Sequence, residues 1–191
     1  MPSSADGFDA AIARAERAVR DAWATAVPGD APALTLIDGR SGSGKTTLAA
    51  RLASGGDSVQ VVALDDLYPG WDGLAEGAEL ARTRILEPYV AGRVARWRRW
   101  DWTRQAPGEK RETHPGLPLV VEGSGMLTAE AAALAPVRVW LESPEPTRRE
   151  RALARDGDTY RPHWARWAAQ EVRHLADDDP LAHATIVVEV P

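Results

Sequence analysis

No cysteine occurs in the 191-residue sequence, which excludes disulfide bonds, thiol nucleophiles and cysteine-based metal sites. Long hydrophobic runs are absent too, since none approaches the ~18–20 apolar residues that a membrane-spanning helix needs. The N-terminus lacks the apolar segment of a signal peptide. We therefore expect a cytoplasmic protein with no membrane partner.

Histidine and lysine are scarce. The four histidines show no paired spacing of the HExxH kind, so we expect no structural zinc site. Lys45 and Lys110 are the only lysines, and arginine supplies the remaining positive charge. The net charge is −5 and the pI is about 5.4, so we expect no stable nucleic-acid partner.

Hydrophobic residues nevertheless make up 44% of the chain, which is enough to bury a core. The length predicts a single domain over residues 1–191.

The spacing of apolar residues over residues 6–26 predicts an amphipathic helix, and the Pro- and Gly-rich residues 28–32 are expected to end it. Further helices are expected at about 128–135, 146–155 and 163–176, and a helical stretch over 74–100 with a break near Pro88; residues 101–116 look irregular. The apolar runs that predict strands are residues 33–38, 58–64, 117–121, 137–141 and 184–190.

Five apolar strands that alternate with helices indicate an α/β fold with a parallel, doubly wound sheet and helices on both faces. Ligands of such sheets bind at the carboxyl ends of the strands. Candidate catalytic residues follow three of the predicted strands: the loop from Gly39 onward, Asp65 and Glu122. The fold class expected is that of P-loop NTPases, with a strand–loop–helix unit at 33–53 and an acceptor-side segment at 65–116.

Residues 39–46 match the pattern GxxxxGK[ST] in full, and we call them the P-loop. Glycines in such a loop turn backbone N–H groups onto phosphate oxygens, and the next helix adds its positive N-terminus. Lys45 is expected to reach the β- and γ-phosphates and Thr46 to ligate Mg²⁺. The sequence thus predicts ATP and Mg²⁺ as cofactors, with these nucleotide-binding residues: Gly39, Arg40, Ser41, Gly42, Ser43, Gly44, Lys45, Thr46 and Thr47.

A second ligand on the metal side should end a neighbouring strand. Glu122 does so after the apolar run LVV and before a glycine, and it is the metal-side carboxylate that we favour. Asp38, directly after the first strand, is the weaker alternative.

Asp65 ends the second strand. A hydroxyl acceptor loses a proton as it attacks phosphorus, so a carboxylate there is useful as a base. A nucleotide acceptor would instead need arginine clamps. Asp65 therefore favours a hydroxyl acceptor, although a turn-forming role for Asp65 or Asp66 is the plain alternative.

The segments GRSGSGKTT, VVALDDLYPG, LVVEGSG and TRRERALARD together resemble the uridine kinase group of P-loop kinases, over most of residues 33–156. That family carries an Asp-x-Phe-Tyr turn whose Asp is the catalytic base, and the residues DDLY at 65–68 are similar, with leucine in place of the first aromatic. The resemblance implies base catalysis by Asp65 and a substrate contact by Tyr68. It implies transfer of the γ-phosphate to a small molecule, with a nucleoside expected.

Family members also carry a Tyr-Asp-Phe stretch that closes on the nucleoside sugar, and Trp100-Asp101-Trp102 is similar to it. Two rings that flank a carboxylate can stack a base and bind sugar hydroxyls. Alternatively, Trp97 and Trp100, three apart on a helix, are core anchors. Trp71 is a further candidate wall. The tryptophan-rich composition of this region departs from the family and leaves a different acceptor open.

A short lid over residues 146–160 is arginine-rich. Arg148, Arg151 and Arg155 share one helix face, and their forked side chains suit phosphate oxygens and transition-state charge. Their order resembles the lid of the same family, which implies a catalytic role. The alternative is a solvated face paired with glutamates.

Other functions stay open at this stage. The acceptor could be a nucleotide, a vitamin-type alcohol or a sugar, and the chain could be a non-kinase P-loop ATPase. A GTPase is disfavoured because no NKxD-type motif follows the fourth strand. A nucleic-acid module would use the arginines and tryptophans of residues 93–104, but the acidic charge and the complete P-loop argue against it. Nothing in the sequence indicates the oligomeric state.

Overall fold

The structure is a computed structural model that describes residues 4–25, 33–55 and 58–191. Its strands are β1 (Leu34–Asp38), β2 (Gln60–Ala63), β3 (Ala95–Asp101), β4 (Ala106–Thr113), β5 (Leu119–Glu122), β6 (Val137–Glu142) and β7 (Ile186–Glu189). Its helices are α1 (Ser4–Thr25), α2 (Lys45–Ala53), α3 (Leu74–Ala81), α4 (Glu87–Val90), α5 (Ala129–Ala132), α6 (Glu145–Tyr160), α7 (Trp164–Asp178) and α8 (Pro180–His183). Shorter turns are η1 (Leu64–Asp66), the π-helical η2 (Arg82–Leu86) and η3 (Arg161–His163).

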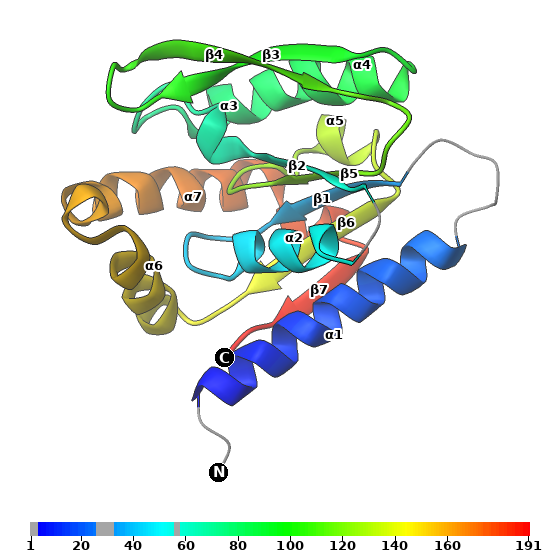
Figure 1. Ribbon diagram of the computed structural model, residues 1–191. Coiled ribbons are helices and arrows are strands. Elements are labelled where there is room, and N and C mark those ends of the chain that lie inside the picture. Colours follow the sequence, from blue (N-terminus) through cyan, green and yellow to red (C-terminus); the bar gives the residue numbers. More distant parts are fainter. Residues whose placement is uncertain (1–3, 26–32, 56–57) are drawn as a thin grey trace.

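Five parallel strands form the central sheet in the order β2-β5-β1-β6-β7 (Figure 1). Every residue of β1, the middle strand, is buried. Continuous apolar strands of this kind need cover on both faces. The predicted parallel α/β fold is therefore confirmed.

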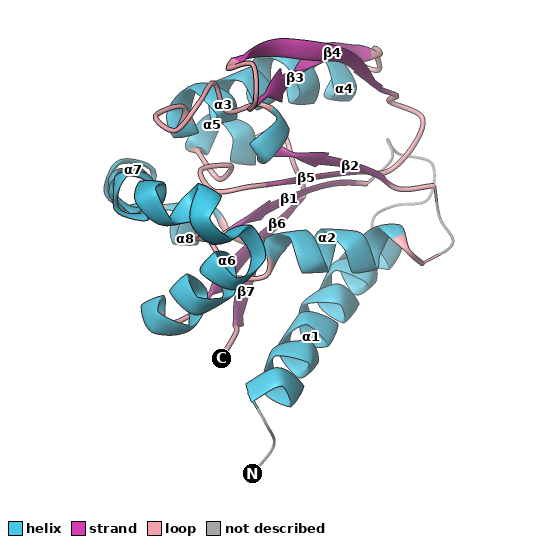
Figure 2. Ribbon diagram, turned by 60° about the vertical axis from the view of Figure 1, so that its left-hand side comes forward, coloured by secondary structure: helices cyan, strands magenta, loops and turns pink. Residues whose placement is uncertain are grey.

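Helices cover both faces of the sheet (Figure 2), and a hydrophobic core lies between the sheet and the helices of each face. Ile37 and its neighbours pack against α1 and α2, whereas Leu34 and Leu36 pack against a core that includes residues of α3, α5 and α7. Alternate residues of one strand thus serve different cores, as the period of two in a strand requires. The doubly wound arrangement brings the P-loop, η1 and the end of β5 to one edge of the sheet.

The prediction for residues 91–116 was wrong. These residues contain an antiparallel hairpin, β3–β4, instead of a helix end followed by irregular chain. The preceding helical stretch ends at Val90, and Gly92 follows with a φ of 68°, a left-handed conformation that commonly ends helices. The π-helical turn η2 lies just before Pro88, which lacks the N–H of a regular helix.

The other helices lie close to their expected positions. The opening helix ends at Thr25, and its predicted stop at 28–32 falls outside the described residues. The lid helix α6 continues to Tyr160 across a kink at Gly157. Among the described residues, no helix combines the length and apolar character needed to span a membrane.

Candidate active site

The P-loop joins the end of β1 to the start of α2. Gly42 has a φ of 82°, and a Cβ atom there would lie 2.1 Å from the carbonyl oxygen of Arg148. Only glycine fits this close approach. No side chain of the described chain caps the N-terminus of α2, and the buried Ser43 hydroxyl has no partner among the described residues. Free N–H groups and a free hydroxyl at a helix N-terminus fit a bound phosphate.

Lys45 folds back over the loop. Its Nζ donates to the carbonyl oxygen of Gly39 at 2.7 Å and to Ser124 Oγ at 3.3 Å. Gly42, Gly44, Lys45, Thr46 and Thr47 line a cavity of about 460 Å³, which we call the P-loop cavity. The ammonium group therefore lies at the cavity where the phosphates of a nucleotide are expected.

Thr46 and Glu122 are brought together as predicted. Thr46 Oγ1 donates to Glu122 Oε1 at 2.9 Å, because β5 pairs with β1 in a register that sets Glu122 beside Ile37. Burial raises the pKa of Glu122, while Lys45 and the bond from Thr46 lower it. A hydroxyl and a carboxylate oxygen are the hard donors that Mg²⁺ prefers, with phosphate oxygens and water completing its shell. The residues present thus fit a magnesium–nucleotide complex.

Asp38, the alternative metal ligand, is fully engaged elsewhere. Its Oδ1 accepts from the backbone N–H of Gly39 at 2.6 Å and of Gly125 at 3.0 Å. Its Oδ2 accepts from the N–H of Leu127 at 2.7 Å and lies 2.9 Å from His174 Nε2. These bonds fix the loops that follow β1 and β5, so Glu122 is the better candidate.

His174 holds Asp38 from the other side. Its Nε2 faces Asp38 and its Nδ1 lies 2.8 Å from Asp178 Oδ2, so both nitrogens donate when the ring is charged. Burial lowers the pKa of His174, but the two carboxylates outweigh burial and raise it to about 9. The ring is therefore an imidazolium at neutral pH.

Glu171, one turn earlier on α7, braces the P-loop. Its Oε1 accepts from the Ser41 N–H at 2.6 Å and from Ser124 Oγ at 3.1 Å, and its Oε2 accepts from Arg40 Nε at 3.3 Å. The side chain is 2% exposed. Arg40 therefore turns toward α7, away from the phosphate side of the loop. Sequence analysis missed Glu171 and His174. The sign that could have revealed them is that these two polar residues continue the apolar face of the helix that Trp164 and Trp167 begin.

Asp65 lies on η1, directly after β2, and lines a second cavity of about 380 Å³. We call it the aromatic cavity. Burial within the cavity walls raises the pKa of Asp65, while Arg155 and Lys45 lower it. Taken as a whole residue, Asp65 is nevertheless exposed, and it lines the cavity together with Arg155. A carboxylate with a raised pKa is better suited to accept a proton near neutral pH.

Aromatic side chains wall the same cavity. Trp71 contacts Trp102 with ring centroids 4.9 Å apart, and lies nearly parallel to Tyr160 at 5.6 Å. Trp102 Nε1 donates to the carbonyl oxygen of Asp65 at 2.8 Å, which ties the hairpin tip to η1. Tyr68 lines the cavity with its ring, while its hydroxyl donates to the Ser124 carbonyl oxygen at 2.8 Å. The predicted residues Asp65, Tyr68, Trp71 and Trp102 are therefore brought together.

Two residues of the predicted set lie elsewhere. Trp100 lines a different cavity, together with Leu67, Leu80 and other residues outside the aromatic cavity. Asp101 Oδ1 accepts from the N–H groups of Thr103 and Arg104 at 3.0 and 2.9 Å, which closes the hairpin turn. Neither residue lines the aromatic cavity.

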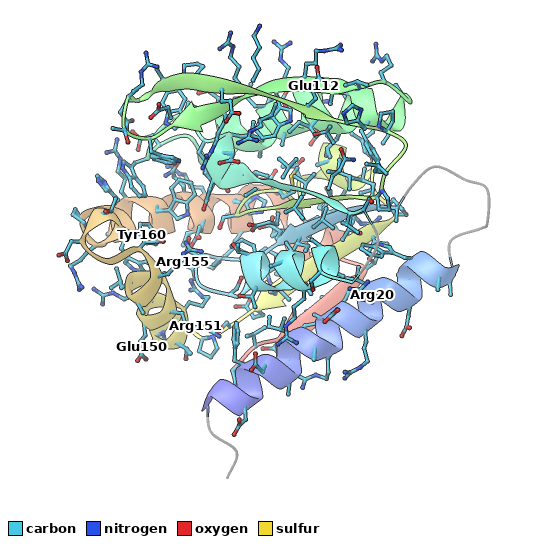
Figure 3. The ribbon with its side chains drawn as sticks, in the orientation of Figure 1. Arg20, Glu112, Glu150, Arg151, Arg155 and Tyr160 are labelled. Atoms are coloured by element: carbon cyan, nitrogen blue, oxygen red, sulfur yellow. The ribbon has the colours of Figure 1, made fainter. Side chains whose placement is uncertain are left out.

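The predicted lid arginines differ in their surroundings, and Figure 3 shows Arg151 and Arg155 beside the lid helix α6. Arg148 is buried behind the loop, where its Nη1 donates to the Ser41 carbonyl oxygen at 3.1 Å. Arg151 and Arg155 line the P-loop cavity. Arg151 bonds Ser143 and covers the ring of Phe8 at 4.8 Å, whereas Arg155 pairs with Asp156 at 2.7 Å.

Arg155 also lines the aromatic cavity, so it lies where the two cavities meet. Its guanidinium acts on the pKa of both Asp65 and Glu122. One positive charge thus lies between the P-loop cavity and the carboxylate of Asp65 in the aromatic cavity.

Comparisons with known proteins agree with this fold. No family model and no curated protein matches the sequence. A structure described as a possible uridine kinase from Bacillus stearothermophilus superposes with a TM-score of 0.67 at 19% identity, covering 94% of this chain and 97% of that one. A putative fructose transport system kinase from Silicibacter sp. TM1040 gives a TM-score of 0.54 at 20% identity, covering 92% and 98%. The chain shares the fold of these structures over nearly its whole length.

Proposed function

We propose that this chain is an ATP-dependent kinase that transfers the γ-phosphate to a hydroxyl group of a small neutral molecule, a nucleoside in the first place. The observation that carries the proposal is the position of Arg155, which lines both the P-loop cavity and the aromatic cavity. Two substrates bound in these cavities would meet at this arginine. The fold shared with structures described as kinases supports the same reading.

The P-loop side binds and orients the phosphates. Its backbone N–H groups and Lys45 would hold the phosphate oxygens, and Thr46 and Glu122, which lie in contact with each other, would hold Mg²⁺. Bound Mg²⁺ supplies positive charge that neutralises the phosphate oxygens. Arg151 and Arg155 add charge on the lid side, where negative charge builds up during transfer.

Asp65 serves the acceptor. The acceptor oxygen forms a bond to the γ-phosphorus as the bond to the β-phosphate oxygen breaks, and ADP leaves. The hydroxyl proton passes to the carboxylate of Asp65, whose pKa burial raises toward the working range. Trp71 and Tyr160 exclude water from the acceptor side, which limits hydrolysis of ATP.

The lining of the aromatic cavity favours a neutral, planar acceptor. Among the described residues that line it, Arg155 is the one cation, and it already pairs with Asp156. A phosphate or carboxylate on the acceptor would face Asp65 and Asp156 without a free positive partner. Trp71, whose ring stacks on His163 at 4.2 Å, and Trp102 instead give the cavity an aromatic wall that suits a flat ring.

A paired assay tests this acceptor class. We expect uridine or cytidine to accept phosphate and the corresponding monophosphates not to. We expect Trp71→Ala to raise KM for the acceptor roughly tenfold, since base–aromatic stacking contributes about 1–3 kcal/mol, while Trp71→Phe keeps most of the affinity and KM for ATP stays unchanged in both. Faster transfer to a nucleoside monophosphate than to the nucleoside would refute the neutral planar acceptor. An acceptor KM that is the same in Trp71→Ala as in the unchanged chain would also refute it.

A further inference from the structure

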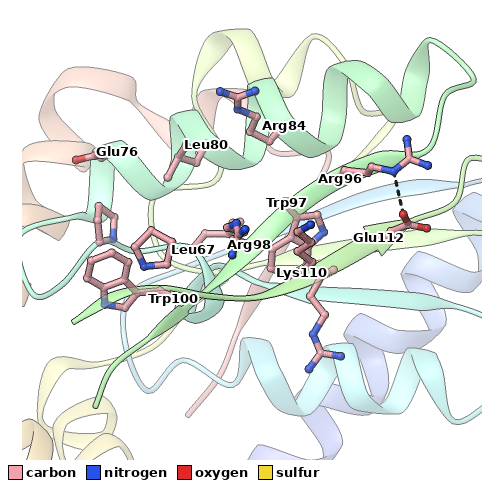
Figure 4. A pocket seen from close by; sticks show the side chains of 13 residues that line it. Leu67, Glu76, Leu80, Arg84, Arg96, Trp97, Arg98, Trp100, Lys110 and Glu112 are labelled. Atoms are coloured by element: carbon pink, nitrogen blue, oxygen red, sulfur yellow. Dashed lines mark hydrogen bonds and ion pairs between the residues drawn. The ribbon is translucent and has the colours of Figure 1, made fainter. Parts of the chain in front are cut away.

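A third cavity, of about 670 Å³, lies between the β3–β4 hairpin and the helices α3 and η2 (Figure 4). It is larger than either cavity of the proposed active site. We call it the hairpin cavity. Its apolar wall includes Leu67, Leu80, Trp97 and Trp100, and cationic side chains surround this wall. The proposed reaction uses none of its charged residues.

Positive charge in the hairpin cavity exceeds negative charge. Five of the lining residues are cationic and two, Glu76 and Glu112, are acidic. Glu112 is already paired with Arg96 at 2.9 Å. Of the remaining cations, Arg111 pairs with Glu109, whereas Arg84, Arg98 and Lys110 pair with no carboxylate among the described residues. This surplus is local, because the whole chain carries a net charge of −5.

Two of the unpaired cations are held side by side. Arg98 and Lys110 are direct partners across the antiparallel strands, and like charges in that position destabilise a hairpin. Among the described residues, the Arg98 side chain has one hydrogen bond, from Nη1 to the carbonyl oxygen of Gly108 at 2.9 Å. The indole N–H of Trp100 is also buried without a partner among the described residues. A bound anion would relieve the repulsion between the two cations.

The hairpin cavity shares its wall with the aromatic cavity. Leu67 and Pro69 line the hairpin cavity, while Tyr68 and Trp71 of the same segment line the aromatic cavity. On the hairpin, Trp100 lines the first cavity and Trp102 the second. A ligand that shifts these segments in the hairpin cavity would therefore also shift the residues that line the aromatic cavity.

We propose that the hairpin cavity is a second ligand site, which binds a small aromatic phosphate ester and thereby changes the affinity of the aromatic cavity for its own ligand. The apolar wall takes the ring of this ligand, and Arg84, Arg98 and Lys110 take its phosphate group. The second part of the proposal rests on the function proposed above, but the first part does not.

Phenyl phosphate is the probe for the site. The full chain is first saturated with Mg²⁺ and a non-hydrolysable ATP analogue, so that the P-loop cavity is filled, and phenyl phosphate is then titrated by calorimetry. We expect one binding site whose affinity falls with added salt. Arg98→Gln/Lys110→Gln should weaken binding by roughly tenfold for each charge removed, the range of a hydrogen bond to a charged group.

A matched control separates this site from general electrostatics. Arg14→Gln/Arg17→Gln removes the same charge from exposed positions on α1, and should leave the affinity unchanged. Circular dichroism checks that each variant is folded, and Arg84→Gln provides an independent substitution on the helix side. The proposal is overturned if phenyl phosphate fails to bind, if phenol binds equally well, or if both double variants bind as the unchanged chain does.

The coupling is measured separately, as the dissociation constant of a nucleoside with and without saturating phenyl phosphate. We expect a change of about threefold or more, within the usual range of coupling between sites, that Arg98→Gln/Lys110→Gln abolishes. An unchanged constant would overturn the coupling. Because the calorimetric binding needs no turnover, an inactive chain that still binds phenyl phosphate through Arg98 and Lys110 would refute only the proposed kinase function.

Discussion

Replacing Asp65 by asparagine tests the acceptor side of the proposed reaction with a minimal change of shape. The variant keeps the volume of the side chain and removes the oxygen that would take up the hydroxyl proton. Trp102 binds the backbone carbonyl of residue 65, not its side chain, so the hairpin contact survives. Lys45 bonds to the carbonyl oxygens of Gly39 and Arg40 and not to Asp65, so the P-loop survives too.

The size of the effect follows from the role of the group. General base catalysis contributes about 10²–10⁴-fold, and phosphoryl transfer lies toward the lower end because its transition state is loose. We therefore expect kcat to fall about 10²–10³-fold, which corresponds to about 3–4 kcal/mol on the barrier. Because burial raises the pKa of Asp65 above 3.8, activity of the unchanged enzyme should also fall in acid at a higher pH than a free aspartate would give.

Asp66→Asn is the matched control. Asp66 carries the same charge one residue on, but pairs with Arg99 at 2.6 Å on the hairpin side, and losing an exposed ion pair costs at most about 1 kcal/mol. Steady-state kinetics give kcat for both variants, and calorimetry gives the affinity for ATP. Transfer by Asp65→Asn within a few-fold of the unchanged enzyme, or an equal loss in Asp66→Asn, would refute base catalysis by Asp65.

Three further predictions concern the metal side, the α7 brace and the lid. Glu122→Gln should raise the Mg²⁺ concentration for half-maximal rate by about ten- to a hundredfold, and an unchanged Mg²⁺ titration would contradict the metal role. The pKa of His174 is raised from 6.5 to about 9, so its charged ring stabilises the folded chain fully below pH 6.5. Up to about 3 kcal/mol of this stabilisation is lost as the pH rises to 9. Urea unfolding at several pH values should show a smaller fall in the free energy of unfolding over this range for His174→Asn than for the unchanged chain. Gly157 has a φ of 56° and a ψ of −135°, with open space around its α-carbon. Gly157→Ala should therefore cost about 1–3 kcal/mol of backbone strain and slow turnover. Gly116→Ala, which is also in open space, should change neither the stability nor the rate.

Much of the fold could be predicted because its signals are local. Each parallel strand reads as a short apolar run, and GxxxxGK[ST] marks one strand end. Asp65 follows β2 and Glu122 ends β5, and these two strands are direct neighbours in the sheet. Their closeness at the carboxyl ends of the strands could therefore be inferred from the topology. The mutual contact of Thr46 and Glu122 follows from the same reasoning.

The hairpin could not be predicted because its pattern imitates a helix. Trp97 and Trp100 are three apart, a helical spacing, but the register of β3 shifts between Arg98 and Trp100. This irregularity resets the alternation of the strand, so both tryptophans line the same cavity. Asp101 was interpreted as a possible sugar ligand, yet its carboxylate closes the turn.

The brace on α7 was missed for a different reason. Glu171 and His174 contact segments more than a hundred residues away, and no local pattern indicates such partners. Buried charges on an otherwise apolar stripe are the one available sign, because they must be paired in the fold.

Transfer of labelled phosphate from γ-labelled ATP with Mg²⁺ to a panel of nucleosides, nucleoside monophosphates and sugars tests the central claim most directly. The account predicts label in the hydroxyl of a nucleoside, dependent on Asp65, with little free phosphate. Label found only as free phosphate, or on a monophosphate in preference to a nucleoside, would contradict it.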